Sequence, residues 1–548
     1  WKTAGLHWDR PESAANVITI TPSDEVPQRI RDALTEAREN LDWTIIYFPA
    51  GVYVINQPIE LTHQDTKVIF QGDGNNTTLV FPYTEVGPDE NCFSIRGTYE
   101  SENSRRPITQ DIPKGSRIIH LDTPESWFRT GDWVHYTEQN LDDAFPQSGY
   151  VGQLAQIETV STDRIQMKGE AAKNYATTHN LWMRKVIPAK NIGFENFQIV
   201  RRRETDDDGN SASPNVGTGK VFRFEKSVNS WITGVESSWA SGAHVSVLRS
   251  AHIYIAGNYM HHATDYGGGG HGYGVVLGSS STHCLVENNI FETLRHAMIA
   301  GMGANSNVFA YNYSIDQHWN YPNQGSDVVL HGRYPYANLF EQNRVERLTA
   351  DPTHGDNGPY NTFFRNKVTA SDFFALANAD ISNIVGNEGI TSRDIPWYIQ
   401  WGWTLSGYDF RASSHVYDVY TRYFPNSGDG NLTDYTEYSH ESWEEFLDDQ
   451  DQEHIDDVLS KSWLNTKSLY RETKPSFVGD DYSFPSYGPN INPDGTLPVT
   501  PLDTGIPAQD RYMQSSKTYL PHPVRRPDPP TEPLSVNIIG PSRLDRGQ

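Results

Sequence analysis

Histidine is concentrated in the middle of the chain. Ten of the 19 histidines lie between His244 and His354, although this stretch is only about a fifth of the 548 residues. Histidine titrates near neutral pH and is the side chain most often used for proton transfer. Tyrosine, aspartate and arginine are interspersed with these histidines. The combination is suited to a reaction in which a base removes one proton, an acid supplies another and a cation neutralises an anionic group.

A repeat of asparagines allows the positions of these residues to be compared. Six asparagines each follow a short apolar run, with spacings of 31, 23, 31, 23 and 21 residues: Asn258, Asn289, Asn312, Asn343, Asn366 and Asn387. A period of this size is typical of a solenoid, and the strand-length, β-branched and aromatic runs predict a parallel β-helix. Asparagine tolerates left-handed backbone at the corners, and its amide can bond to the amides of neighbouring coils. Val235 and Asn196 continue the repeat toward the N-terminus.

Counting each residue from its own asparagine places polar side chains at matching positions of successive coils. In the two longer coils, which follow Asn258 and Asn312, eight residues are subtracted from this count to allow for the extra length. Three positions are then shared by seven side chains: Tyr273, His296 and Asp327; His331 and His354; Arg333 and Asp356. The residues between them, such as Gly274 with Val276 and Ala297 with Ile299, are expected to face inward, so the polar ones should face outward. Adjacent coils lie about 4.8 Å apart, which predicts one polar cluster on the outer face.

The two longer coils are expected to wall this cluster with loops. The first loop supplies His261, His262, Asp265, Tyr266 and His271, and its Gly267–Gly270 run is conformationally free. The second supplies His318 and Trp319. Arg203, from a run of three arginines, is a candidate for binding acidic sugars. Asp206, Asp208 and Asn210 have alternating oxygen ligands that could hold Ca²⁺. No other metal or cofactor is expected.

The N-terminal region resembles the pectate-lyase-like superfamily of right-handed parallel β-helices. In that superfamily a capping helix precedes an FPAGxY strand and a GxG turn. Here a helical pattern over 26–40 precedes YFPAGVYV and then VIFQGDGNNTTLVF. The resemblance implies an all-β, single-stranded, right-handed parallel β-helix that acts on carbohydrate. Gly270-His271-Gly272 is similar to an element of the pectin-hydrolysing members, but the paired aspartates of those enzymes have no counterpart before His271.

Five segments are expected along the chain. The first three are an N-terminal cap with the first coils (1–111), a small inserted β module with short antiparallel strands (112–185) and central coils carrying the active groove (186–395). A C-terminal cap follows (396–481), with an acidic helix over 442–457. The last is a Pro/Gly-rich linker leading to the opening strand of an immunoglobulin-like sandwich (482–548). The fold class is therefore a β-helix with a capping helix, an inserted β module and a helical or irregular C-terminal cap.

Composition excludes several classes of partner. The formal charge is −25, which disfavours a nucleic-acid or anionic-membrane binder, and no run of apolar residues is long enough to span a membrane. Two cysteines, Cys92 and Cys284, are too few for a disulfide framework. The chain begins at Trp1, which is interpreted as a secreted protein without its signal peptide.

The leading hypothesis is a secreted lyase that cleaves an acidic, uronate-containing and optionally sulfated polysaccharide by β-elimination. His296 or His331 is assigned as base, Tyr273 or Tyr266 as acid, and Arg333 as the carboxylate clamp, with His271 as a further catalytic candidate. The substrate-binding candidates are Asp265, Asp327, His354, Asp356, His318, Trp319 and Arg203. The alternatives are a β-helix glycoside hydrolase that uses Asp265, Asp327 or Asp356, and a non-catalytic carbohydrate-binding or adhesive β-helix.

Overall fold

The computed structural model describes most of the chain up to residue 391 and two C-terminal segments. The described residues are 1–6, 14, 16–40, 42–101, 104–139, 148–201, 217–318, 325–351, 354–369, 374–376, 382–385, 387–391, 467–488 and 502–519, with four short strands between 404 and 425. The expected helix over 442–457 and the sandwich strand over 535–548 lie outside these residues. No helix in the described part of the chain is long and apolar enough to cross a lipid bilayer.

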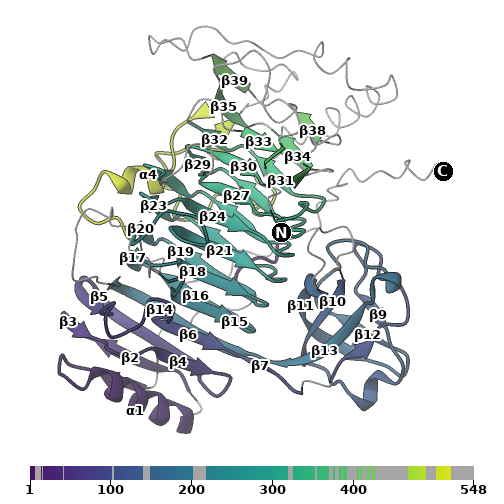
Figure 1. The fold of residues 1–548 in the computed structure, drawn as a ribbon, viewed down its shortest axis with the longest axis horizontal. Helices are drawn as coiled ribbons and strands as arrows, with labels where there is room; N and C mark the ends of the chain where they lie inside the picture. Colours follow the sequence, from purple (N-terminus) through teal and green to yellow (C-terminus); the bar gives the residue numbers. More distant parts are fainter. Residues whose placement is uncertain are drawn as a thin grey trace.

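Parallel strands stack into a β-helix with three faces (Figure 1). The first face consists of β1 (Asn16–Thr19), β2 (Thr44–Phe48), β5 (Thr66–Val80), β14 (Ala189–Val200), β16 (Ser227–Thr233), β19 (Ala251–Ala256), β22 (Leu285–Glu287), β25 (Val308–Ala310), β28 (Leu339–Glu341), β31 (Thr362–Phe364), β34 (Ser382–Val385) and β38 (Val416–Val419). The second consists of β3 (Gly51–Val54), β17 (Glu236–Ala240), β20 (Tyr259–Ala263), β23 (Ile290–Glu292), β26 (Tyr313–Ile315), β29 (Arg344–Val345), β32 (Lys367–Val368), β35 (Glu388–Thr391) and β39 (Arg422–Pro425). The long strands β5 and β14 pair with strands of both faces and join them into one sheet.

The third face is a separate nine-stranded parallel sheet and carries the candidate site. Its strands are β4 (Ile59–Thr62), β6 (Phe93–Arg96), β15 (Lys220–Glu225), β18 (Ala243–Leu248), β21 (Tyr273–Gly278), β24 (His296–Ala300), β27 (Val328–Leu330), β30 (Leu348–Ala350) and β33 (Phe374–Leu376). Apolar side chains from all three faces meet inside the coil, where the rings of Phe309, Phe340 and Phe363 stack at 4.8 and 5.1 Å.

The predicted asparagine ladder is present and fully buried. Each amide nitrogen donates to the side-chain oxygen of the next asparagine, at 2.9–3.0 Å from Asn258 through Asn387. Each side-chain oxygen also accepts the backbone N–H of the preceding ladder asparagine. The N–H of Val235 donates to Asn258 Oδ1 at 2.9 Å, so Val235 extends the repeat as predicted.

The expected left-handed backbone at these corners belongs to a different residue. The residues before the first five ladder asparagines adopt positive φ: Gly257, Asn288, Tyr311, Gln342 and Arg365. The turn therefore points the preceding side chain outward and the asparagine inward, where its amide replaces the hydrogen bonds that water would otherwise make. A second, shorter ladder of Asn307, Asn338 and Asn361 lines another corner and was not recognised in the sequence.

Asn312→Ala is expected to lower the free energy of unfolding by about 2–3 kcal/mol, because it removes a buried amide and leaves its partners unsatisfied. Asn312 donates to Asn343 Oδ1 and to the Val286 carbonyl, both at 2.9 Å, and accepts from Asn289. Denaturant unfolding measures the change. Asn40→Ala, at the end of the N-terminal helix, is the control and should change stability by about 0.5 kcal/mol or less. Equal effects of the two substitutions would contradict a stabilising ladder.

The N-terminal end of the coil is covered by α1 (Val26–Glu39), as the helical spacing predicted (Figure 1). Its apolar side is buried, and Pro27 lies in its first turn, where a missing N–H costs no helical hydrogen bond. Arg38 near its C-terminal end pairs with the buried Asp65 at 2.8 Å, which ties the helix to the first coils.

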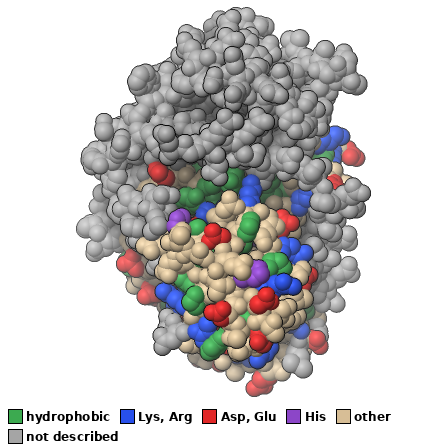
Figure 2. Space-filling view, turned by 90° about the vertical axis from the view of Figure 1, so that its right-hand side faces the viewer, with side chains coloured by type: hydrophobic (Ala, Val, Ile, Leu, Met, Phe, Trp, Pro, Cys, Tyr) green, Lys and Arg blue, Asp and Glu red, His purple; other side chains and the backbone are tan. Residues whose placement is uncertain are grey.

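The inserted β module is an antiparallel sheet beside the coil (Figure 1). It consists of β7 (Thr98–Tyr99), β8 (Arg106–Pro107), β9 (Ile118–His120), β10 (Trp133–Gln139), β11 (Ser148–Val160), β12 (Arg164–Met167) and β13 (Trp182–Ile187). It packs on turns of the β-helix: Asn305 Nδ2 donates to the Gly152 carbonyl at 2.7 Å, and the hydroxyls of Tyr175 and Tyr336 lie 2.6 Å apart. On this side of the molecule acidic, basic and histidine side chains are interspersed rather than segregated (Figure 2).

Within the expected linker over 482–548, the described residues 482–488 and 502–519 pack against the coil. Residues 467–488 and 502–519, called the strap here, include β40 (Tyr487–Gly488), β41 (Leu502–Asp503) and α4 (Pro507–Tyr512), and they pack against the coil. The strap contacts the outward-pointing corner residues: Arg511 donates to Asn288 at 2.7 Å, the N–H groups of Ser486 and Tyr487 donate to Gln342, and the Tyr519 N–H donates to the Gly257 carbonyl. Proline-rich composition concealed this docking, because the apolar anchors Leu469, Tyr487 and Ile506 are isolated in the sequence. A further antiparallel pair, β36 (Thr404–Leu405) and β37 (Tyr408–Asp409), completes the strands of the described chain.

Candidate functional site

Four aromatic side chains form a continuous row on the third face. Tyr273 and His296 are paired in register at the starts of β21 and β24, and their ring centroids lie 5.2 Å apart. His331, which follows β27, lies 5.7 Å from His296, and His354 lies 4.8 Å from His331. The structure therefore brings together Tyr273, His296, His331 and His354, as the coil register predicted. These four side chains are called the ring row.

The predicted alternation of inward and outward residues does not hold along these strands. In β24, Ala297 and Met298 are consecutive and both belong to the interior core, after which Ile299 lies on the outer side with Val329 and Ala300 returns to the interior. Two consecutive inward residues shift the alternation by one, so the assignment of Val276 and Ile299 to the interior was wrong. His296, before the shift, remains outward.

Asp327 does not belong to the outer face. Met298 pairs with Val328, which places Asp327 beside Ala297 rather than His296. Its side chain is buried, Oδ1 accepts from the Ser314 hydroxyl, and Oδ2 accepts the N–H groups of Glu346 and Arg347 at 2.9 and 2.7 Å. Burial raises the pKa of Asp327 to about 7. Asp327 thus holds a turn from inside the coil, and its predicted contact with substrate is wrong. The insertion that was subtracted for this coil was one residue too long, which put Asp327 one position out of register.

His296 is buried and neutral. Its Nδ1 lies 2.9 Å from the Ser326 carbonyl, so it donates there when protonated on that nitrogen, and 3.3 Å from the Ser326 N–H. Burial, followed by charge repulsion from the protonated form of His331 and from Arg295, lowers the pKa of His296 to about 3. A base with so low a pKa takes up protons poorly near neutral pH, which disfavours the assignment of His296 as base.

Replacing His296 with glutamine is expected to flatten the dependence of stability on pH. The folded pKa of about 3 lies below the usual 6.5, so between these values the unfolded chain binds a proton that the folded chain does not. Stability present above pH 6.5 is therefore lost as the pH falls, by about 1.4 kcal/mol per pH unit, and the variant lacks this contribution. Urea unfolding from pH 7 to pH 4 measures it. His244→Gln should behave alike, since burial also lowers the pKa of His244 to about 3. Parallel curves for wild type and both variants would contradict neutral burial.

His331 has the geometry of a general base. Its Nδ1 lies 3.0 Å from Asp351 Oδ2, so Nδ1–H donates to the carboxylate and leaves Nε2 as an acceptor. Its side chain is 18% exposed, and that of Asp351 is 31% exposed, so both are reachable. Asp351 was not identified in the sequence. Aligning Val328–His331 with Leu348–Asp351 on the paired strands β27 and β30 places the two residues side by side.

Tyr273 and the adjacent Arg295 complete this part of the face. Burial raises the pKa of Tyr273, so its phenol is protonated at neutral pH and available as an acid. The Arg295 guanidinium lies 5.8 Å from the Tyr273 ring and donates to the Gly267 carbonyl at 2.7 Å. Arg295 therefore brings positive charge to the ring row and anchors the glycine-rich loop. It was overlooked because it precedes the matching positions by one residue.

The loop residues are held mainly by one another. His271 Nδ1 donates to the Gly268 carbonyl at 2.7 Å and lies 3.2 Å from Asp265 Oδ2. The Tyr266 hydroxyl accepts the Ala263 N–H at 3.0 Å, its ring lies 4.4 Å from that of His318, and burial raises its pKa to about 12. Tyr266 is thus less suited to be the acid than Tyr273.

The remaining predicted residues are at the edge of the site or outside the description. Arg333 lies 3.8 Å from the Met302 sulfur and 6.0 Å from the Tyr150 ring, toward the inserted module. Burial is the main cause of the lowered pKa of His354, and the charge of Arg333 contributes to it. The N–H of Tyr334 donates to the Asp356 carbonyl, so the two turns are adjacent. His261 and His262 lie on β20 of the second face, not in the loop. Outside the described residues are Trp319, Arg203, Asp206, Asp208 and Asn210.

The described part of the chain contains no group of three or more His, Cys, Asp or Glu residues arranged to hold a metal ion. Cys92 and Cys284 are both free and buried. Burial raises the pKa of both thiols to about 12.

The stacked coils and their buried ladder define a right-handed parallel β-helix protein, as predicted. No family model matches the chain, and no curated protein matches it. Among solved structures it is similar to the tailspike protein gp49 from Pseudomonas phage LKA1, with 17% identity and a TM-score of 0.49 over 67% of this chain and 56% of the tailspike. It is also similar to the Gp54 tailspike of Acinetobacter baumannii bacteriophage AP22, solved in complex with a capsular saccharide (16% identity, TM-score 0.42, 68% of this chain and 55% of that one). Endo-xylogalacturonan hydrolase from Aspergillus tubingensis matches at 11% identity and a TM-score of 0.36, over 74% of this chain and 93% of the hydrolase.

Proposed function

We propose that this β-helix protein is an extracellular, carbohydrate-active enzyme that cleaves an acidic polysaccharide by β-elimination. The observation that supports the proposal is the His331–Asp351 pair in the same row of side chains as the protonated Tyr273. A base with a free Nε2 and a neutral phenol on one face are the two proton-transfer groups that the reaction requires.

The proposed reaction balances with these groups. His331 Nε2 removes the proton from the carbon next to the uronate carboxylate, and the electron pair forms the double bond to the adjacent carbon. The bond from that carbon to the glycosidic oxygen breaks, and Tyr273 protonates the leaving oxygen. Arg295, with Arg333 at the edge of the site, stabilises the negative charge that develops on the carboxylate. Proton return from His331 to Tyr273 through solvent resets the site.

Hydrolysis has less support from the side chains. A glycosidase requires two carboxyl groups on either side of the glycosidic bond. Of the three aspartates considered for this role, Asp327 is inside the coil and Asp265 is paired with His271 in the loop. The Asp351 carboxylate lies beside the ring row, but it is bonded to His331.

A panel of anionic and neutral polysaccharides, with products measured by mass and ultraviolet absorbance, tests the proposal. β-Elimination gives a new unsaturated end that absorbs in the ultraviolet and a product that is lighter by one water than the hydrolytic one. We expect unsaturated products from uronate polymers alone. New reducing ends without unsaturation would show hydrolysis instead. Saturable binding to a polymer that is never cleaved would show a non-catalytic carbohydrate-binding protein.

A further inference from the structure

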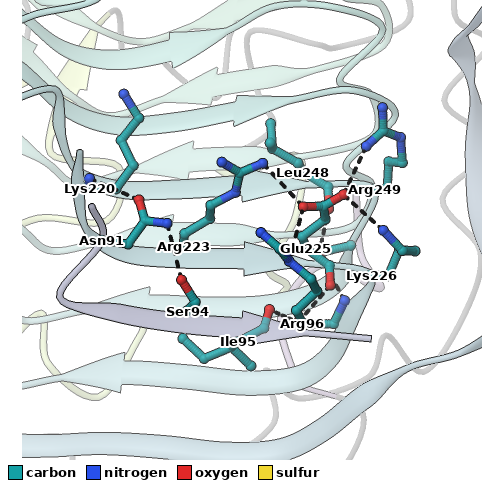
Figure 3. A network of polar contacts seen from close by, with 12 residues as sticks. Asn91, Ser94, Ile95, Arg96, Lys220, Arg223, Glu225, Lys226, Leu248 and Arg249 are labelled. Atoms are coloured by element: carbon teal, nitrogen blue, oxygen red, sulfur yellow. Dashed lines mark hydrogen bonds and ion pairs between the residues drawn. The ribbon is translucent and has the colours of Figure 1, made fainter. Parts of the chain in front are cut away.

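Four cationic side chains converge on one carboxylate at the N-terminal part of the third face (Figure 3). Glu225, at the end of β15, accepts from Lys226 at 2.8 Å and from Arg249 at 3.1 Å through Oε1. Through Oε2 it accepts from Arg223 at 3.1 Å and lies 3.6 Å from Arg96 Nε. The four cations come from β6, β15 and the two turns that follow β15 and β18, and they are called the cation cluster here.

The cation cluster carries more positive charge than Glu225 neutralises. Burial alone would raise the pKa of Glu225, but Lys226, Arg223 and Arg249 hold it at about 2, so the carboxylate is ionised. One negative charge then faces four positive ones. In the described part of the chain every ion pair of these four cations is made to Glu225. A local excess of about three positive charges in a chain of net charge −25 requires a reason.

Three of the four cations are accessible, whereas the Lys226 side chain is 11% exposed. The side chains of Arg96, Arg223 and Arg249 are 55, 32 and 29% exposed, whereas Glu225 is 11% exposed. A guanidinium has five N–H donors, and Glu225 accepts one from Arg223 and one from Arg249. The three guanidinium groups come from β6, β15 and the turn after β18, and groups of this kind bind carboxylate or sulfate oxygens.

The cation cluster and the ring row share one sheet face. Glu225 pairs with Leu248, and Leu248 pairs with Gly278, while His331 follows Leu330 on the same sheet. Four strand spacings separate β15 from β27, or about 19 Å. Lys220, at the start of β15, is in register with Ala243, which pairs with Tyr273. An extended polymer lying across the coils would contact both groups of side chains.

We propose that Arg96, Arg223 and Arg249, with the positive charge of Lys226 beside them, bind an anionic group, a carboxylate or a sulfate ester, on a polysaccharide that extends along the sheet to the ring row. The inference rests on the proposed function for its polymer, but the anion site itself does not depend on catalysis. Glu225 positions the four cations when no ligand is bound and competes with the ligand for their hydrogen bonds.

A purely structural role predicts a different response to mutation. If the cluster serves only to hold β6, β15 and the turn after β18 together, Glu225 is its indispensable centre. Removing the charge of Glu225 then does not increase the affinity for anions. If the cluster binds anions, Glu225→Gln leaves four cations without a counter-charge, and anion affinity rises. The lowered pKa of Lys226, which burial and then the charges of Arg249 and Arg96 produce, agrees with cations that repel one another.

Inorganic sulfate is the first probe, with affinity measured by calorimetry on the full chain at constant ionic strength. We expect the double variant Arg96→Gln/Arg249→Gln to bind sulfate roughly tenfold more weakly than wild type, and Glu225→Gln to bind it more tightly. Arg31→Gln, on the exposed side of α1, is the matched control and should leave affinity unchanged. Circular dichroism verifies folding, and because Arg96 is the most exposed of the four cations, Arg96→Gln alone serves if the double variant does not fold. Absent sulfate binding in wild type, or equal affinity in all variants, would overturn the proposal.

A second measurement links the site to the polymer. Binding of the uronate polymer and of the same polymer with its carboxylates reduced is compared in wild type and in the arginine double variant. We expect the double variant to lose affinity for the acidic polymer only. Loss of affinity for both forms would show general damage and contradict a specific subsite. If sulfate binding responds as predicted but no polysaccharide binds, the anion site stands and the proposed function fails.

Discussion

His331→Ala is expected to reduce kcat on an acidic polysaccharide by about 10²–10⁴-fold, the range typical of a lost general base. His331 is the one histidine of the ring row whose Nδ1 is bonded to a carboxylate, which fixes the tautomer with Nε2 free. Asp351→Asn should cause a smaller loss of kcat, because Asp351 acts through His331 as a positioning residue. Initial rates of unsaturated product, measured over a range of pH, provide the test.

The matched control is His318→Ala. His318 packs on Tyr266 in the neighbouring loop and is not part of the ring row. We expect KM to change more than kcat for this variant. If His318→Ala and His331→Ala reduce kcat equally, or if His331→Ala retains full activity, His331 is not the base. Asp351→Asn should also shift the pH profile of kcat, a response that a merely structural defect would not produce.

Arg471→Met is expected to lower the free energy of unfolding by about 3–5 kcal/mol, because it leaves Glu287 charged and buried without its cation. Arg471, in the strap, donates to both oxygens of Glu287 at 2.7 and 2.8 Å, and the Glu287 side chain is 1% exposed. The hydroxyls of Tyr254 and Tyr470 also donate to this carboxylate, so the whole network is enclosed. Urea unfolding monitored by fluorescence measures the change.

An exposed ion pair of the same chemistry gives the comparison. Arg117 pairs with Glu158 on the inserted sheet, where the side chains are 37 and 40% exposed. Arg117→Met should change stability by about 1 kcal/mol or less, since water screens such pairs. A similar small effect of Arg471→Met would mean that the strap does not stabilise the coil. Early proteolysis within 467–519 in Arg471→Met would support release of the strap.

The fold was predictable because its strongest determinant is local and repeated. Each coil places an asparagine after a short apolar run, so Asn258 to Asn387 fixed the solenoid and the spacing of its coils. The same spacing brought Tyr273 next to His296 and His331 next to His354. Alternation along each strand was less informative, since two consecutive inward residues such as Ala297 and Met298 shift the pattern without any change in residue type.

The parts of the site that were missed depend on single-residue shifts or on distant chain segments. Asp327 is a strongly polar residue at a nearly matching position, yet it points inward because a turn supplies two N–H donors there. Asp351 belongs beside His331 only when the short strands β27 and β30 are aligned, and their shortness leaves that alignment weak in the sequence. Contacts of the strap depend on isolated side chains far from their partners, such as Arg471 and Glu287, which periodicity cannot reveal.

The strap changes how the solenoid should respond to stress. Coils that contact only their neighbours can fray one at a time from an open end, because each has its own local stability. Here the two segments of the strap are bonded to Gly257, Asn288 and Gln342, which lie on different windings. Opening one winding therefore breaks its contacts with the strap and disturbs the strap contacts of the other windings, so the windings should not open one at a time. Hydrogen exchange in these windings should consequently proceed as one cooperative event rather than as a gradient from the end.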